Sequence, residues 1–242
     1  MFRLSLIGKK YIDTILEAKR VDIGETNQII NRAEKLGGLR NLLIPNHSET
    51  ITTIYETGEK QAIIVSDLGS STRTSYTQTI VPSLITTNLI EQINSNSDWA
   101  HVSYLDDIEE QFKYIENITI PYSLDFCTDR NREKYIEVMK KASIILDSSE
   151  RIELYKGLCL AVPIVLHAPE GIQILVEGQI VFEETNQRLS NLSVNGAGDI
   201  YASYFIKHYH DSNRDLYDSA KKAMLKTTKL LVALSSEPSY NR

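Results

Sequence analysis

The amino-acid sequence predicts an α/β fold in which a mostly parallel sheet is covered by helices on both faces and carries a small β-rich flap. Three observations lead to this prediction. Strand-like and helix-like segments alternate from Trp99 to His167, a β-hairpin pattern follows, and the first third of the chain holds paired strand-like segments. Strands that alternate with helices are typical of parallel sheets, whereas strands joined by tight turns are antiparallel.

The first third of the chain predicts one core strand and the flap. The apolar run Leu4–Ile7 predicts a strand, and residues 20–33 predict one or two more. Alternating residues at 50–55 and 61–65 predict a further pair. We therefore expect the flap to be built from about 20–33 and 50–77.

The middle of the chain predicts the parallel part of the sheet. Short runs of β-branched and aromatic residues alternate with charged segments that have helical spacing. The expected strands are 99–105, 122–126, 143–147 and 163–167, and the expected helices are 106–114, 129–141 and 149–158.

A hairpin and two helices are predicted for the C-terminal part. Apolar residues alternate over 172–176 and again over 180–182, with Glu177-Gly178 as the turn between them. An apolar helix is expected over 199–210, and a long amphipathic helix over 216–234.

Length and charge set the class of protein. A chain of 242 residues with 42% hydrophobic and 24% charged residues predicts one domain spanning 1–242. The net charge of -6 argues against broad binding to nucleic acid or to an anionic membrane. The N-terminal apolar run is too short for a signal peptide, and no run approaches ~18 apolar residues. We expect a cytoplasmic protein in which Cys127 and Cys159 are reduced thiols.

The segment Asn195-Gly196-Ala197-Gly198-Asp199 is the strongest candidate for chemistry. Small residues at the start of a helix leave backbone N–H groups without intrahelical partners, and the helix dipole adds positive potential, which together form an anion site. A carboxylate in the first turn can accept a proton from a bound hydroxyl. The alternative is an ordinary helix start, in which Asp199 only interacts favourably with the dipole.

This loop resembles the C-terminal signature of the PfkB/ribokinase family of carbohydrate and nucleoside kinases. The order of strand, hairpin, loop and helix from Pro163 to His210 matches the family, and the resemblance is good over 98–234 and patchy before that. It implies a ribokinase-like three-layer α/β/α fold. It also implies that Asp199 is the catalytic base and that Asn195, Gly196, Ala197 and Gly198 form the anion hole.

Two N-terminal segments match the family's substrate site. Asp13 follows Gly8 by five residues, as the family's substrate-binding aspartate does, and an exposed loop aspartate is the alternative. Gly37 and Gly38, followed by Asn41, resemble the family's glycine pair and asparagine, with one residue fewer between them. A helix boundary or turn is the alternative there.

Two further segments match the nucleotide side of the family site. Asp147-Ser148-Ser149-Glu150 stands in the place of the family's Asn-x-x-Glu motif, which implies Glu150 as a magnesium ligand. The alternative is a helix start capped by a serine. Ala168 and Gly171 occupy the turn that lies against the nucleotide, and Ala168 stands where family members have glycine.

Some positions depart from the family pattern. Ser193 and Val194 replace an Asp-Thr pair, and the chain is short between Asn41 and Thr50. In the family's flap an arginine lies near the substrate, but here Arg73 and its polar neighbours are interpreted as a solvated loop. Segments 98–103 and 123–130 resemble the fructosamine or fructoselysine kinase branch.

The resemblance implies an ATP- and Mg²⁺-dependent kinase that phosphorylates a hydroxyl of a sugar or sugar-like small molecule. A nucleoside kinase, or a binding or regulatory protein on a degenerate kinase scaffold, is the alternative. Family members often dimerise through the flap, so a homodimer is expected. The identity of the acceptor, the oligomeric state and any dependence on monovalent cations do not follow from the sequence.

Overall fold

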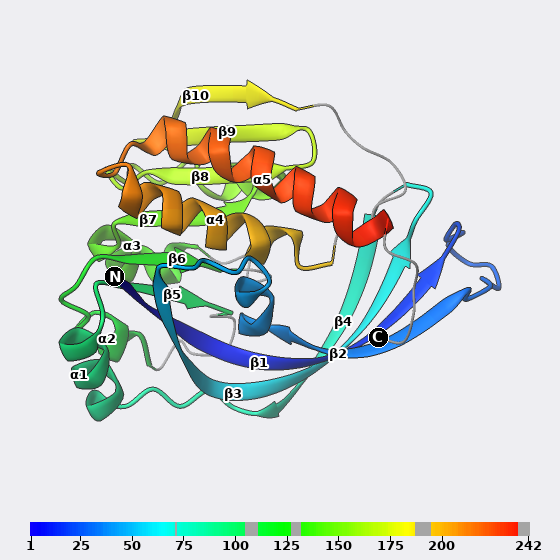
Figure 1. Cartoon of the computed structure of the whole chain (residues 1–242), viewed down its shortest axis with the longest axis horizontal. Coiled ribbons are helices and arrows are strands. Elements are labelled where there is room, and N and C mark those ends of the chain that lie inside the picture. The colour runs from blue at the N-terminus through cyan, green and yellow to red at the C-terminus, as the bar shows by residue number, and fades with distance from the viewer. Residues whose placement is uncertain (71, 105–110, 127–131, 187–194, 237–242) are drawn as a thin grey trace. The chain divides into compact units, whose positions relative to one another are not determined.

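The computed structural model describes residues 1–70, 72–104, 111–126, 132–186 and 195–236 (Figure 1). The chain forms two compact units. Unit 1 comprises Met1–Lys9, Asn46–Gly58 and Val81–Asn186, and unit 2 comprises Lys10–Pro45, Glu59–Ile80 and Gln187–Arg242. Strands β1 (Phe2–Ala18) and β3 (Thr50–Asp67) each contribute residues to both units.

Unit 1 contains the mostly parallel sheet that the sequence predicts (Figure 1). The first part of β1 pairs in parallel with β5, and parallel pairing continues through β6, β7 and β8. Strands β9 and β10 then form the expected antiparallel hairpin at the edge. Their bounds are β5 (Trp99–Ser103), β6 (Tyr122–Asp125), β7 (Ile144–Ser148), β8 (Ile164–Ala168), β9 (Gly171–Val176) and β10 (Gln179–Thr185).

The central strands of unit 1 are buried along nearly their whole length, as parallel strands covered on both faces should be. The core includes Val102, Leu124 and Ile145, none of which is exposed. Phe112 and Tyr135 pack against this core with their ring centroids 4.4 Å apart. The apolar runs that predicted the strands are therefore the residues that form the core.

Within the described residues the helices of unit 1 are shorter than expected, and residues 106–110 and 129–131 of two expected helices lie outside them. They are α1 (Thr87–Asn96), α2 (Phe112–Ile115) and α3 (Ile136–Lys141), with the 3₁₀ turns η3 (Glu133–Tyr135) and η4 (Ser149–Leu154). The sequence analysis missed α1, whose N-cap Thr86 accepts a hydrogen bond from the backbone of Leu89. The helix expected over 149–158 is the 3₁₀ turn η4. None of the helices in the described ranges is long and apolar enough to cross a membrane.

Unit 2 contains the second part of β1, β2 (Asn31–Gly38), and parts of β3 and β4 (Thr72–Val81). Strand β2 is antiparallel to β1, from Lys10 opposite Gly38 to Glu17 opposite Asn31. The strand expected over 20–33 begins only at Asn31. The Asn27 side chain instead holds a turn by bonding to the backbone N–H and C=O of Asp22, which replaces strand pairing. The assignment of a single domain with a lid stays a prediction.

Two long helices complete unit 2, and both agree with the sequence prediction. Helices α4 (Ala197–Asp211) and α5 (Leu216–Ser236) pack against each other (Figure 1). Along α4, the rings of Tyr201, Phe205 and Tyr209 follow one another with centroid separations of 6.2 and 5.5 Å. Helix α4 also contacts η1 (Leu39–Leu43), the 3₁₀ turn that follows β2.

Candidate active site

The glycine loop of unit 2 starts helix α4 as the sequence predicts. Gly196 is the residue before the helix and has a φ of 79°, which favours glycine. The first intrahelical bond runs from the Ile200 N–H to the Gly196 carbonyl, so the preceding N–H groups have no intrahelical acceptor. Asp199 lies in this first turn and is 9% exposed. The loop therefore places backbone N–H groups that lack intrahelical acceptors beside a buried carboxylate.

Asn41 lies directly against this loop. Its Nδ2 donates a hydrogen bond of 2.9 Å to Oδ2 of Asp199. A Cβ atom on Gly196 would lie 2.9 Å from Cγ of Asn41, so the close approach requires glycine at position 196. Turn η1 brings Asn41 next to the glycine loop. Asn41, Gly196 and Asp199, which were all singled out from the sequence, thus meet in unit 2.

Asp13 packs against the glycine pair in the same unit. It lies on β1 opposite Lys35 of β2, and a Cβ atom on Gly37 would lie 2.0 Å from Oδ2 of Asp13. Gly38 ends β2 with a φ of 61° and turns the chain into η1. The two glycines therefore have separate structural roles: Gly37 makes room for Asp13, and Gly38 directs the chain toward Asn41.

The pKa of Asp13 is raised above its ordinary value because burial disfavours the ionised carboxylate. Lys35, Arg73 and the Asn195 amide oppose this effect and lower the pKa in part. Asp13 is 3% exposed, so it is not the exposed loop aspartate of the alternative interpretation. A buried carboxylate near two cations and an amide is suited to bind a polar ligand.

Arg73 was interpreted from the sequence as part of a solvated loop, and the structure gives it a specific contact. Its guanidinium donates a hydrogen bond of 2.5 Å to Oδ1 of Asn195. The Asn195 Nδ2 atom is buried beside Asp13, whose pKa it lowers, and it makes no hydrogen bond of regular geometry to any described residue. Because the amide oxygen is occupied by Arg73, the nitrogen is presented as a donor close to Asp13. A buried donor beside a buried carboxylate is suited to bind a polar atom of a ligand.

The predicted nucleotide-side residues Glu150, Ala168 and Gly171 lie in unit 1. Glu150 is exposed in the first turn of η4. Ala168 and Gly171 are paired at the end of the β8–β9 hairpin, and a Cβ atom on Gly171 would lie 2.1 Å from the Glu184 carbonyl oxygen. The close approach of β10 therefore explains why position 171 needs a glycine.

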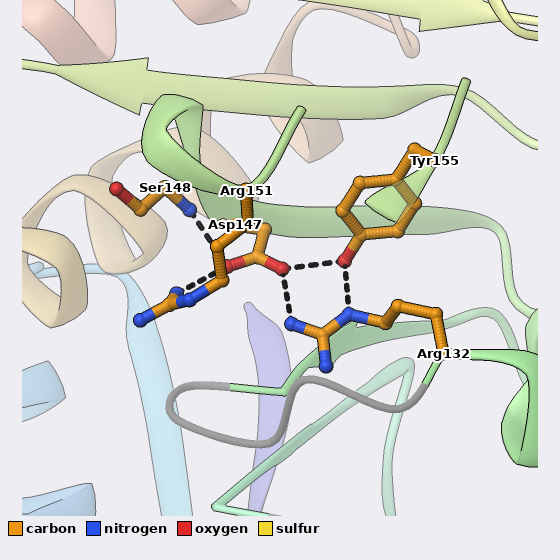
Figure 2. A network of polar contacts seen from close by, with 5 residues as sticks. All are labelled: Arg132, Asp147, Ser148, Arg151 and Tyr155. Atoms are coloured by element: carbon orange, nitrogen blue, oxygen red, sulfur yellow. Dashed lines mark hydrogen bonds and ion pairs between the residues drawn. The ribbon is translucent and has the colours of Figure 1, made fainter. Parts of the chain in front are cut away.

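Asp147, which stands in the place of the family's asparagine, is buried in a polar network with two arginines and a tyrosine (Figure 2). In the described ranges, no three His, Cys, Asp or Glu side chains group together as a metal site. Ser193, Val194 and Cys127, on which other expectations rest, lie outside the described residues.

Comparisons with known proteins identify the fold of this chain. No protein-family model matches the sequence, and no curated protein matches it. Among solved structures, a ribokinase from Cryptococcus neoformans var. grubii serotype A in complex with ADP matches with a TM-score of 0.71 at 14% identity, covering 99% of this chain and 96% of that one. The chain has the ribokinase fold.

Two other ribokinase-fold structures match over a similar extent. A microbiome-derived acarbose kinase has a TM-score of 0.69 at 14% identity, covering 100% of this chain and 96% of that one. A nucleoside kinase from Burkholderia thailandensis in complex with inosine has a TM-score of 0.67 at 11% identity, covering 94% of this chain and 90% of that one. The expected fold class is confirmed, and the resemblance to the fructosamine or fructoselysine branch stays a prediction.

Proposed function

We propose that this chain is an ATP-dependent kinase that transfers the γ-phosphate to a hydroxyl of a sugar or sugar-like small molecule. The observation that carries the proposal is the position of Asp199. Its carboxylate is held by Asn41 in the first turn of α4, directly after the glycine loop. The ribokinase fold supports the proposal, because the matching structures include sugar and nucleoside kinases.

The proposed reaction is an in-line displacement at the γ-phosphorus. The acceptor hydroxyl oxygen forms a bond to phosphorus while the bond to the bridging oxygen of ADP breaks, and the hydroxyl proton passes to Asp199. The backbone N–H groups at the start of α4 donate to the oxygens of the transferred group and stabilise the charge that develops there. Mg²⁺ would be held by Glu150 and would neutralise charge on the donor phosphates.

We propose that the acceptor binds between Asp13 and Asn195. Asp13 accepts a hydrogen bond from a hydroxyl of the acceptor, while the buried Nδ2 of Asn195 beside it donates one to an oxygen of the same molecule. Arg73 holds the Asn195 amide in this orientation through their 2.5 Å hydrogen bond. These contacts explain why polar groups are buried beside the glycine pair.

A second candidate is a binding or regulatory protein on the same fold. The observation that favours it is the state of Asp147, whose carboxylate accepts hydrogen bonds from the Ser148 backbone and from three side chains. A carboxylate so fully occupied is a poor ligand for a cation. The expected homodimer through the flap stays a prediction.

The two candidates are separated by two measurements on the purified protein. One is a search by mass spectrometry for phosphorylated products from ATP and Mg²⁺ with sugars, amino sugars, glycated amino acids and nucleosides. The other is calorimetry with ATP and Mg²⁺ alone. A phosphorylated sugar supports the leading proposal, and a phosphorylated nucleoside supports the nucleoside-kinase alternative. The absence of both nucleotide binding and a phosphorylated product supports the second candidate.

A further inference from the structure

Arg73 is an exposed arginine of strand β4 whose guanidinium is held beside the glycine loop in unit 2. Its Nη1 donates a hydrogen bond of 2.5 Å to Oδ1 of Asn195, the residue that precedes Gly196. The contact joins residues that are 122 positions apart in the chain. It therefore brings a cation from β4 to the start of the loop that ends at the proposed base, Asp199.

No ion pair links Arg73 to a carboxylate in the described ranges. Its interactions there are the hydrogen bond to the neutral Asn195 amide and a longer-range attraction to Asp13. Ser71 and the segment 187–194, which adjoin Arg73 and Asn195 in the chain, contain no acidic residue. An arginine is always charged in proteins, and its guanidinium carries a planar fork of N–H donors. Most of these donors therefore remain available to a ligand.

The Asn195 amide lies between Arg73 and Asp13. Its Oδ1 accepts from Arg73, and its buried Nδ2 lies on the side of Asp13. Burial raises the pKa of Asp13, and the charge of Arg73 and the Asn195 amide both oppose this effect, so the three groups are close together. Arg73 and Asp13 nevertheless form no direct ion pair. The site thus holds a cation and an anion on the two sides of one neutral amide.

The other charged groups of this site have partners of their own. Lys35 lies opposite Asp13 in the pairing of β2 with β1, and its charge also acts on Asp13. The Asp199 carboxylate accepts a hydrogen bond from Asn41. Lys35 and Asp199 each have further partners as well. Arg73 differs from both because its fixed contact is with a neutral group, which leaves its charge to attract an anion.

We propose that the acceptor is an anionic sugar-like molecule, whose carboxylate or phosphate ester binds Arg73 while one of its hydroxyls binds Asp13. The inference rests on the proposed kinase function and specifies the charge of its acceptor. A planar guanidinium binds such an anion through short, often paired, charge-assisted hydrogen bonds, and it makes only weaker contacts to a neutral sugar. The Asn195 amide sets the spacing, because the hydroxyl and the anion must lie on its two sides. Small hydroxy acids and sugar phosphates have this chemistry.

The test is a calorimetric comparison of ligand pairs whose members differ in one anionic group. The pairs are gluconate with glucitol, glucuronate with glucose, and glycerol phosphate with glycerol. In the wild-type protein we expect the anionic member of at least one pair to bind about tenfold or more tightly than its neutral partner. In Arg73→Gln the affinity for that anion should fall about 10–100-fold, as for loss of a charge-assisted contact, and the affinity for the neutral member should stay within about twofold.

Two further variants and one further ligand make the comparison specific. Arg32→Gln is the matched control, because Arg32 lies on β2 of the same unit and forms an exposed ion pair with Glu34. Its affinities should equal those of the wild type. Arg73→Lys keeps the charge without the planar fork and should give an intermediate loss for the anionic probes. The affinity for ATP should not change in any of these variants, since the proposed partner of Arg73 is the acceptor.

Several results would overturn the inference. An equal loss for the anionic and neutral members in Arg73→Gln would show that Arg73 only orients Asn195, and a loss of ATP affinity would assign Arg73 to the donor. A wild-type protein that binds no anionic probe more tightly than its neutral partner, including one that binds neither, would also overturn it. If Arg73→Gln does not fold, Arg73→Lys decides, and wild-type affinity for the anions in a folded Arg73→Lys would then count against the proposal.

The outcome is separable from that of the kinase proposal because binding needs no turnover. Selective loss of the anionic probes in Arg73→Gln, in a protein that forms no phosphorylated product, supports the anion site and contradicts the kinase. Phosphorylation of a neutral sugar at equal rates by the wild type and Arg73→Gln, without preference for any anionic probe, supports the kinase and contradicts the anion site.

Discussion

Asn41 donates a 2.9 Å hydrogen bond to the Asp199 carboxylate across 158 positions in the sequence. The contact fixes the carboxylate beside the start of α4, and Asn41 is itself 4% exposed. Since a hydrogen bond to a charged group contributes roughly 1.5–3 kcal/mol, its removal should allow Asp199 to leave its productive position. Asn41 is thus a positioning residue for the proposed base.

The first prediction concerns this contact. Asn41→Ala should lower kcat roughly tenfold or more and leave the KM for the acceptor within about twofold, because the orientation of the base is lost and acceptor binding is kept. Steady-state kinetics at saturating ATP measure both constants. Asn94→Ala is the control, at a half-buried asparagine of unit 1 that bonds to the Asn117 carbonyl and the Thr119 N–H. A change in KM alone would count against the positioning role.

The second prediction concerns Gly196. Its φ of 79° and the 2.9 Å approach of Asn41 predict that Gly196→Ala destabilises the protein by about 1–3 kcal/mol. Gly157→Ala is the matched control, because a Cβ atom there meets no atom within 4 Å, and it should be nearly neutral. Urea unfolding of both variants measures the difference. Equal stabilities would contradict the described packing of Asn41 on the loop.

The third prediction uses the raised pKa of Asp13. Burial, its main cause, favours the protonated carboxyl in the folded state. The folded state then binds a proton at Asp13 more tightly than the unfolded state does. At neutral pH the ionised Asp13 therefore lowers the free energy of unfolding, and this loss is relieved as pH falls through the pKa of Asp13 in the folded state. Asp13→Asn should therefore raise the free energy of unfolding at pH 7 and weaken acceptor binding. Urea unfolding at pH 7 and pH 4.5 measures the change.

Two outcomes would contradict this account of Asp13. One is a stability gain in Asp13→Asn that grows as pH falls, which is the opposite sign. The other is unchanged acceptor affinity, which would remove Asp13 from the binding site even if the pH dependence of stability were as expected. Asp218→Asn, at an exposed aspartate paired with Lys222 on α5, controls for the loss of one negative charge in unit 2.

The fourth prediction concerns the buried ion pair of Arg132 and Asp147. Arg132→Met leaves a fully buried carboxylate with one partner fewer and should cost about 3–5 kcal/mol of stability. The exposed pair of Arg3 and Asp98 provides the comparison, and Arg3→Met should not change stability measurably. Thermal and urea unfolding give both values. A similar small effect for the two variants would show that Arg132 is not needed to bury Asp147.

The residues of the candidate site could be singled out from the sequence because they lie in short motifs that resemble those of a known family, and their roles stay predictions. Gly38 and Gly196 have the positive φ that glycine adopts readily, whereas the contacts of Gly37 with Asp13 and of Gly196 with Asn41 join segments distant in the sequence. The strands of unit 1 were predictable because their apolar runs form the core. The turn at 20–30 could have been predicted from Asn27, whose side chain bonds to the backbone of Asp22.

The features that were missed depend on residues distant in the sequence. Arg73 looked solvated, and only its contact with Asn195, 122 positions away, gives it a role. The carboxylate of Asp147 on β7 accepts hydrogen bonds from Arg132 and Tyr155, and no short motif connects these residues. Helix α1 was missed because few of its residues are apolar, and only Ile90 and Ile93 are buried. Such features are set by tertiary packing.

The central claim, that Asp199 is the base of a phosphoryl transfer, is tested most directly by Asp199→Asn. The measurement is the rate of acceptor phosphorylation at saturating ATP, Mg²⁺ and acceptor, together with ADP binding by calorimetry and with Asp218→Asn as the control. The account predicts a fall in kcat of about 10²–10⁴-fold in Asp199→Asn with ADP affinity unchanged. A variant that phosphorylates the acceptor at the wild-type rate would contradict it.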